Sequence, residues 1–88
     1  MPVCFYRSRD EFMLEHPSAM DKADVLAAEE SRKCHWLFDH AIYDKRKKQF
    51  IVSYYSPCAP SPDPCILTIV IKAFRGKLTP TVYQKFDE

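Results

Sequence analysis

The sequence predicts an α+β fold in which one main helix, over about residues 18–33, packs on an antiparallel sheet of four to five strands. Three observations predict this fold. Residues 18–33 contain no glycine or proline and are rich in alanine, which favours a helix. The segments on either side of them alternate with the period of two that is typical of strands. A chain of 88 residues has room for a single compact domain, 1–88. The predicted order is therefore strand, helix and three strands, with a further strand at the C-terminus.

A short strand is expected over Pro2–Arg7, with Val3 and Phe5 on one side and Cys4 and Tyr6 on the other. The following segment, around residues 10–14, favours either a single helical turn or a loop.

The start of the main helix is the clearest local signal. Pro17 precedes Ser18, and Asp21 follows three residues later, which predicts that Ser18 caps the first turn as in a capping box. Small and apolar side chains then repeat at spacings of three and four: Met20, Ala23, Ala27, Ser31 and Cys34. This stripe predicts a helix that lies close to the sheet.

After Cys34 the apolar period changes to two, which predicts a hairpin. On its first strand the side chains expected on one face are Trp36, Phe38, His40 and Ile42, and those expected on the other are Leu37, Asp39, Ala41 and Tyr43. The second strand, Gln49–Tyr55, alternates Phe50, Val52 and Tyr54 against Ile51, Ser53 and Tyr55. Asp44–Lys48 forms the charged tip, a loop of four or five residues because no Asn-Gly or Asp-Gly is present.

Four prolines make Ser56–Pro64 a stiff loop between strands. The nearly continuous apolar run of Ile66–Phe74 predicts a strand buried on both faces, and Gly76 marks the turn that ends it. The last segment contains Pro80, which predicts an edge strand or else a short terminal helix starting near Thr79.

The formal net charge of +1 is too small for a protein that coats nucleic acid or an anionic membrane by bulk attraction. Four cations are consecutive, however, at Lys45–Lys48, so the sequence predicts one local basic patch. No leader for export and no membrane helix are recognised, and we expect a cytoplasmic protein without a membrane partner. The single glycine argues against a nucleotide-binding loop.

Four cysteines formally permit two disulfides. Free thiols are expected in a reducing compartment, with Cys4 and Cys34 as small core residues. Cys58 and Cys65 bracket the proline loop and leave a disulfide or a pair of zinc ligands as alternatives. The two-residue spacing of zinc ribbons is absent, so neither a metal nor another cofactor is predicted.

Catalysis is not predicted. His16, His35 and His40 would permit a general base, and a ribonuclease using His35 or His40 is a third interpretation. Asp39 is adjacent to His40 but is expected on the opposite face of its strand. No motif for a nucleophile accompanies the histidines.

The predicted function is that of a small non-enzymatic binding module, an adaptor, inhibitor or regulatory protein that occupies the surface of a partner protein. One helix covers only one face of a sheet, and the chain has more large aromatic side chains than a small core needs. Tyr43 and Tyr55 are the predicted exposed anchors, assisted by the four cations Lys45, Arg46, Lys47 and Lys48. Small phage and viral proteins that disable host machinery are often of this size, which is an analogy of scale alone.

The alternative is a small protein that binds RNA or single-stranded DNA. In that case Lys45–Lys48 would contact phosphates, and nearby aromatic rings would stack on bases.

Overall fold

The computed structural model describes residues 3–29, 36–56 and 65–86, which form five strands and two helices. The strands are β1 (Val3–Tyr6), β2 (Leu37–Asp44), β3 (Gln49–Ser56), β4 (Cys65–Phe74) and β5 (Lys77–Phe86). The helices, α1 (Arg9–Glu15) and α2 (Pro17–Glu29), follow β1 in the chain. Every strand is antiparallel to its neighbours, in the sheet order β1-β2-β3-β4-β5. The predicted α+β class and antiparallel sheet are confirmed.

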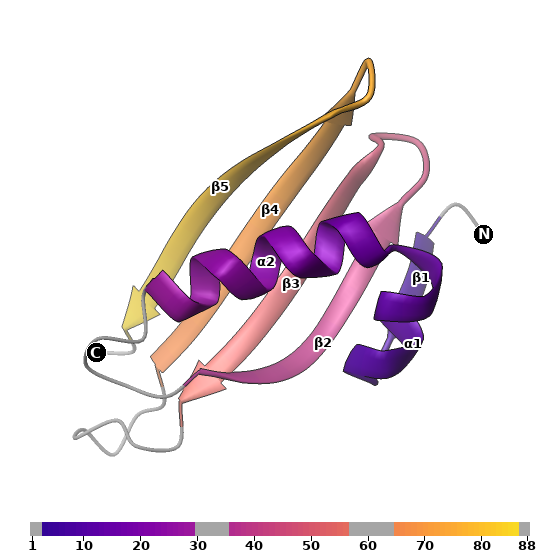
Figure 1. The fold of residues 1–88 in the computed structure, drawn as a ribbon. Coiled ribbons are helices and arrows are strands. Elements are labelled where there is room, and N and C mark those ends of the chain that lie inside the picture. The colour runs from indigo at the N-terminus through magenta and orange to yellow at the C-terminus, as the bar shows by residue number, and fades with distance from the viewer. Residues whose placement is uncertain (1–2, 30–35, 57–64, 87–88) are drawn as a thin grey trace.

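Both helices pack on the same face of the sheet, with α2 running across the strands and α1 beside β1 (Figure 1). We call this face the covered face. Alanine side chains let α2 lie close to the strands, because Ala19, Ala23 and Ala27 are buried together with Met20. The predicted helical stripe is confirmed as far as Ala27, and the core lies between this stripe and the covered face.

His16 joins the two helices. Its backbone N–H donates to the Phe12 carbonyl over 2.8 Å and ends α1, and its carbonyl accepts from the Met20 N–H over 3.1 Å and begins α2. The predicted cap at Ser18 is therefore wrong. Pro17 is the first helical residue, where its missing N–H costs nothing, and Ser18 lies exposed within the first turn.

One carboxylate ties both helices to the sheet. Asp24 of α2 forms an ion pair with Arg9 of α1 and accepts a hydrogen bond of 3.2 Å from the Tyr54 hydroxyl of β3. Burial and the Asp24 charge both raise the pKa of Tyr54, so this phenol is the donor.

A β-bulge in β2 overturns part of the predicted alternation. Phe38 pairs with Tyr54 and His40 pairs with Ser53, so Asp39 is an extra residue between them. The bulge moves Phe38 to the covered face, where it packs against the core, and leaves Leu37 on the opposite face. Phe38 therefore lies on the face opposite to His40 and Ile42, whereas the sequence predicts all three on one face.

The prediction that β4 is buried on both faces is also wrong. Leu67, Ile69 and Ile71 are fully buried on the covered face, whereas Ile66 and Val70, on the other face, are only half-buried. No described element covers that second face.

The two turns at one end of the sheet have the expected positions. Lys45–Lys48 connects β2 to β3, and Arg75 with Gly76 connects β4 to β5. Both central residues of the second turn have positive φ (50° and 78°), as a type I′ hairpin turn requires. β5 is an edge strand that accommodates Pro80, as predicted. The end of the predicted helix (residues 30–33), the proline loop at 57–64, and Cys34, His35 and Cys58 lie outside the described residues.

Candidate functional site

The face of the sheet opposite the helices carries apolar side chains from every strand, with a row of polar ones, His40, Ser53 and Thr68, among them, and we call it the open face. It carries side chains from all five strands: Val3, Phe5, Leu37, Ile42, Ile51, Tyr55, Ile66, Val70 and Tyr83. Phe5 is 55% exposed, Tyr83 54% and Tyr55 39%. Ile42, Ile51 and Val70 lie between them in adjacent positions of the central ladder and are half-buried by one another. An apolar surface that spans a whole sheet is characteristic of an interaction site.

The two tyrosines predicted as anchors lie on opposite faces. Tyr55 is on the open face, as predicted. Tyr43 is on the covered face, where its ring stacks on Phe50 with centroids 4.6 Å apart. The prediction that Tyr43 is an exposed anchor is wrong, because the bulge at Asp39 places Tyr43 on the same face as Phe38. Phe5 and Tyr83 are the exposed aromatic residues that sequence reasoning missed; their alternation in β1 and β5 was visible, but which face the helices cover was not.

His16 is enclosed by aromatic side chains of the covered face. Its ring centroid lies 4.7 Å from that of Tyr43 and 4.9 Å from that of Phe50, and its Nε2 is 3.3 Å from the Tyr6 hydroxyl. Burial lowers the pKa of His16 below its usual value, because the charged imidazolium is poorly solvated there. This half-buried histidine thus packs on aromatic side chains of the covered face, away from the open face.

His40 is held on the open face by two contacts. Its Nδ1 is 2.6 Å from Asp39 Oδ2, and its ring stacks on Phe5 with centroids 5.2 Å apart. The expectation that Asp39 and His40 point to opposite faces is wrong, because the bulge between them brings the two side chains together. A carboxylate on one ring nitrogen can orient a general base, and Ser53 is the register partner of His40. However, one face of the imidazole is occupied by Phe5, and the pair lies on a flat sheet rather than in a cleft.

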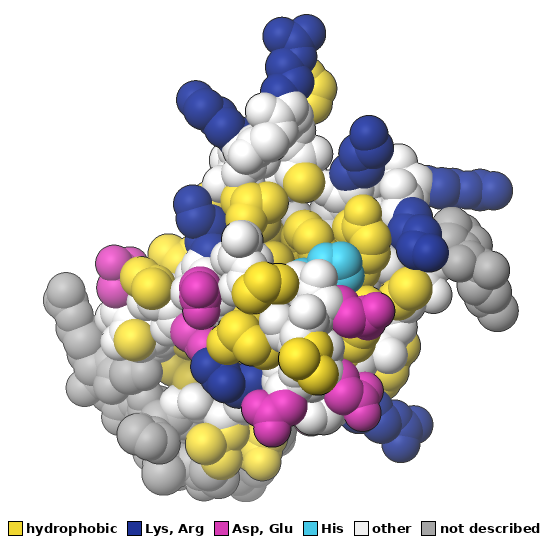
Figure 2. Space-filling view, turned by 45° about the vertical axis from the view of Figure 1, so that its right-hand side comes forward, with side chains coloured by type: hydrophobic (Ala, Val, Ile, Leu, Met, Phe, Trp, Pro, Cys, Tyr) yellow, Lys and Arg dark blue, Asp and Glu magenta, His cyan; other side chains and the backbone are white. Residues whose placement is uncertain are grey.

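Seven cations gather at the end of the sheet where the two hairpin turns lie, and we call this region the basic end. Its members are Lys45, Arg46, Lys47, Lys48, Lys72, Arg75 and Lys77, all of them exposed. Figure 2 shows Lys and Arg side chains at this end and acidic side chains gathered over the helices. The predicted patch of four cations is thus joined by three that the sequence places 24 or more residues later.

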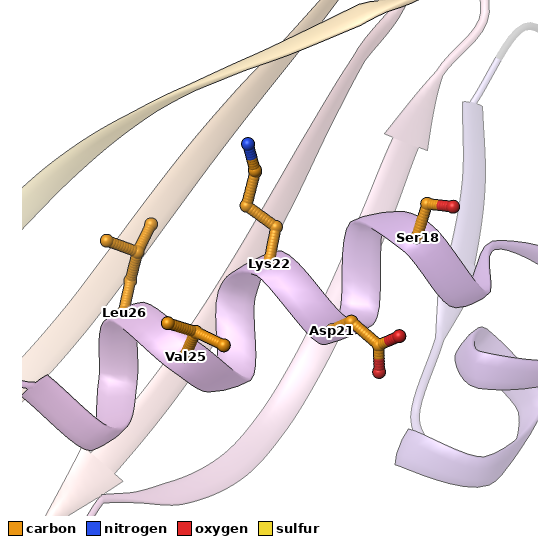
Figure 3. Close-up of a pocket in the computed structure, with 5 residues that line it drawn as sticks. All are labelled: Ser18, Asp21, Lys22, Val25 and Leu26. Carbon is orange, nitrogen blue, oxygen red and sulfur yellow. The ribbon is translucent and has the colours of Figure 1, made fainter.

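A shallow hollow on the outer side of α2 is lined by Ser18, Asp21, Lys22, Val25 and Leu26 (Figure 3). All five side chains come from one helix. Lys22 reaches across it to donate a hydrogen bond of 3.3 Å to the Leu78 carbonyl of β5. The hollow is a wide-open surface beside a helix, without the convergent polar groups that fix a small ligand.

The thiol of Cys4 is free and packs against the core, as expected. Within residues 3–29, 36–56 and 65–86, no cluster of three or more His, Cys, Asp or Glu side chains could hold a metal ion. In the same part of the chain, neither helix is long and apolar enough to span a bilayer.

Comparison with known proteins leaves the geometry as the basis for assigning a function. No family model, no curated protein and no solved structure matches this chain.

Proposed function

We propose that the protein is a non-enzymatic binding module whose open face docks on a partner protein. The observation that carries this proposal is a five-stranded sheet face without a covering helix, whose apolar side chains include exposed aromatic rings near its edges. Large aromatic side chains bury much area at low entropic cost and often dominate the energetics of an interface.

The centre of the open face favours a protein over a nucleic acid. Ile42, Ile51 and Val70 are aliphatic, and bases stack on flat rings rather than on branched alkyl groups. Charged side chains lie toward the margin. Asp44 of β2 and Lys72 of β4 are there, on either side of their shared register partner Gln49 in β3. The centre also holds Ser53 and Thr68, whose hydroxyls are uncharged, and a centre depleted of charge with charged groups at its margin is usual in a protein interface.

The size of the face also fits a protein partner. Five strands about 4.8 Å apart and about 8 residues long, at ~3.4 Å per residue, outline roughly 650 Å². Stable interfaces of standard size bury about 800 Å² on each partner. A partner that covered this face and a little of its margin would therefore bury enough surface for a specific complex.

The test is affinity capture from an extract of the organism that encodes the protein. The binding variant is Tyr55→Ala/Tyr83→Ala, and the matched control is Leu14→Ala/Val25→Ala, which removes two exposed apolar side chains from the helices. We expect a protein that is retained by the wild type and the control but lost from the binding variant. Each tyrosine should weaken the purified complex by more than about 1 kcal/mol, with melting temperatures nearly unchanged. Equal retention by all three proteins would contradict the proposal.

Sedimentation of the purified protein tells whether the partner is a second copy of the chain. Dimers that dissociate in Tyr55→Ala/Tyr83→Ala but persist in the control would identify the second copy as the occupant of the open face.

A further inference from the structure

The basic end is assembled by tertiary structure from two hairpins. The Ala73 N–H donates to the Lys48 carbonyl over 2.8 Å, and Gln49 is the register partner of Lys72. These contacts hold the β2–β3 turn against the last residues of β4, just before the β4–β5 turn. Three cations of the second hairpin, Lys72, Arg75 and Lys77, are thereby added to the four of the first.

The charge at this end is left uncompensated by the described side chains. The ion pairs among them involve Arg9 with Asp24 and His40 with Asp39, and none includes a cation of the basic end. Asp44 is the nearby carboxylate, and its Oδ1 already accepts hydrogen bonds from the backbone N–H groups of Arg46 and Lys47. The basic end has a net charge of +6 with Asp44 included, so the rest of the chain, whose total is +1, carries −5. The near-neutral total thus conceals a strongly polarised molecule.

Two of the cations occupy backbone positions that favour other residues. Lys48 has φ 51° and Arg75 has φ 50°, in the left-handed region where glycine or asparagine is preferred. A residue with a Cβ is disfavoured there, because the Cβ comes close to the following carbonyl oxygen. Cationic side chains therefore stand at the two turns despite a conformational cost, which suits a role for their charge.

An exposed aromatic ring lies among these cations. Phe74 is 69% exposed, and the Arg75 guanidinium lies 5.2 Å from its ring centroid. Keeping a hairpin tip in solution requires charge but no aromatic ring. A ring beside cations is what an unpaired base needs, because the base stacks on the ring while the cations contact its phosphates.

From these observations we propose that the basic end binds single-stranded nucleic acid. The cations of the two turns contact successive phosphates, and Phe74 stacks on a base. The site adjoins the open face, because Lys72 lies at the margin of that face and Phe74 is the next residue of β4 with the same parity. A protein with both surfaces would bring its partner to a nucleic acid strand.

The test measures the binding of a fluorescent oligouridylate of about 20 nucleotides by fluorescence anisotropy over a series of salt concentrations. We expect dissociation constants of about 1–100 µM at physiological salt, with a log–log salt slope of about −0.7 for each phosphate contacted. Lys72→Gln/Lys77→Gln should weaken binding at least fivefold and reduce the magnitude of the slope by about 1.4, because two contacts are lost. Arg7→Gln/Lys22→Gln makes the same change in net charge away from the basic end and should alter affinity less than twofold.

Phe74→Ala tests the stacking contact. It should weaken oligouridylate binding about fivefold or more at unchanged salt slope, whereas Leu14→Ala, another exposed apolar site, should have no effect. Three results would overturn the proposal: no binding at about 50 mM salt, equal effects of the two charge-matched double variants, or equal affinity for a duplex together with no effect of Phe74→Ala. Displacement of the oligonucleotide by polyglutamate at equal charge concentration would also overturn it and indicate an acidic protein as the ligand. Binding is compared only among variants whose melting temperature is close to that of the wild type.

Discussion

Both faces of the sheet carry apolar side chains, but the open face also carries polar ones such as Ser53 and Thr68, and only the covered face lies beneath helices. On the covered face, Val52, Leu67, Ile69 and Ile71 are fully buried beneath α1 and α2. On the open face, Ile42 of β2, Ile51 of β3, and Ile66 and Val70 of β4 are only half-buried. The apolar side chains of the covered face are therefore expected to contribute more to folding than those of the open face. Those of the second face stay available for binding, which is why the proposed function rests there.

The largest expected effect comes from testing this difference with one residue type on two neighbouring strands. Ile69→Ala removes a fully buried side chain from the covered face and should lower the free energy of unfolding by about 2–5 kcal/mol. Ile51→Ala makes the same deletion on the open face and should cost less than about 1.5 kcal/mol, because part of its surface is already in water. Urea denaturation measures both values. Equal losses in the monomeric protein would mean that the open face contributes as much to folding as the covered face does.

The intermediate effect concerns pH, to which the histidines of the two faces should contribute differently. Burial lowers the pKa of His16, so the folded state holds its imidazole neutral while the unfolded chain takes up a proton near pH 6.5. The free energy of unfolding therefore keeps this contribution at a pH above the pKa of His16 in the unfolded chain. It loses the contribution as the pH falls through the lower pKa of His16 in the folded protein. Melting temperatures at pH 7.5 and 5.5 should thus differ more for the wild type than for His16→Gln.

His40→Gln provides the control for that measurement, since His40 lies on the open face beside Asp39. If His40→Gln removed the loss of stability at low pH and His16→Gln did not, enclosure of His16 by aromatic side chains would not be the cause.

The smallest effect is expected at the start of α2, on the outer side of the helix layer. Ser18→Ala should change the free energy of unfolding by less than about 0.5 kcal/mol, because Ser18 is exposed within the first turn and does not cap it. A loss near 1 kcal/mol in urea denaturation would show that its hydroxyl does act as a cap, and would move the first helical residue of α2 from Pro17 to Ala19.

Local sequence patterns determined the elements of this protein. The alanine-rich segment predicts α2 because it lacks glycine and proline, and the alternation of Gln49–Tyr55 predicts β3 with the correct faces. The position of the β2–β3 turn follows from its run of charged residues, and Pro80 correctly marks β5 as an edge strand. These features depend on interactions between residues close in the chain, which is why the sequence reveals them.

Only the tertiary structure decided which side chains are free to bind. The bulge at Asp39 reverses the parity of β2, so that Tyr43 joins the core and Leu37 does not. The apolar run of β4 would have the same sequence pattern whether helices covered one face of the strand or both. Both helices lie on one face, so only Leu67, Ile69 and Ile71 are fully buried. The basic end likewise depends on the pairing of β3 with β4, which brings Lys48 beside Lys72 and Ala73. Contacts between distant segments leave no local periodicity in the sequence, so the open face and the basic end emerge only when the sheet is assembled.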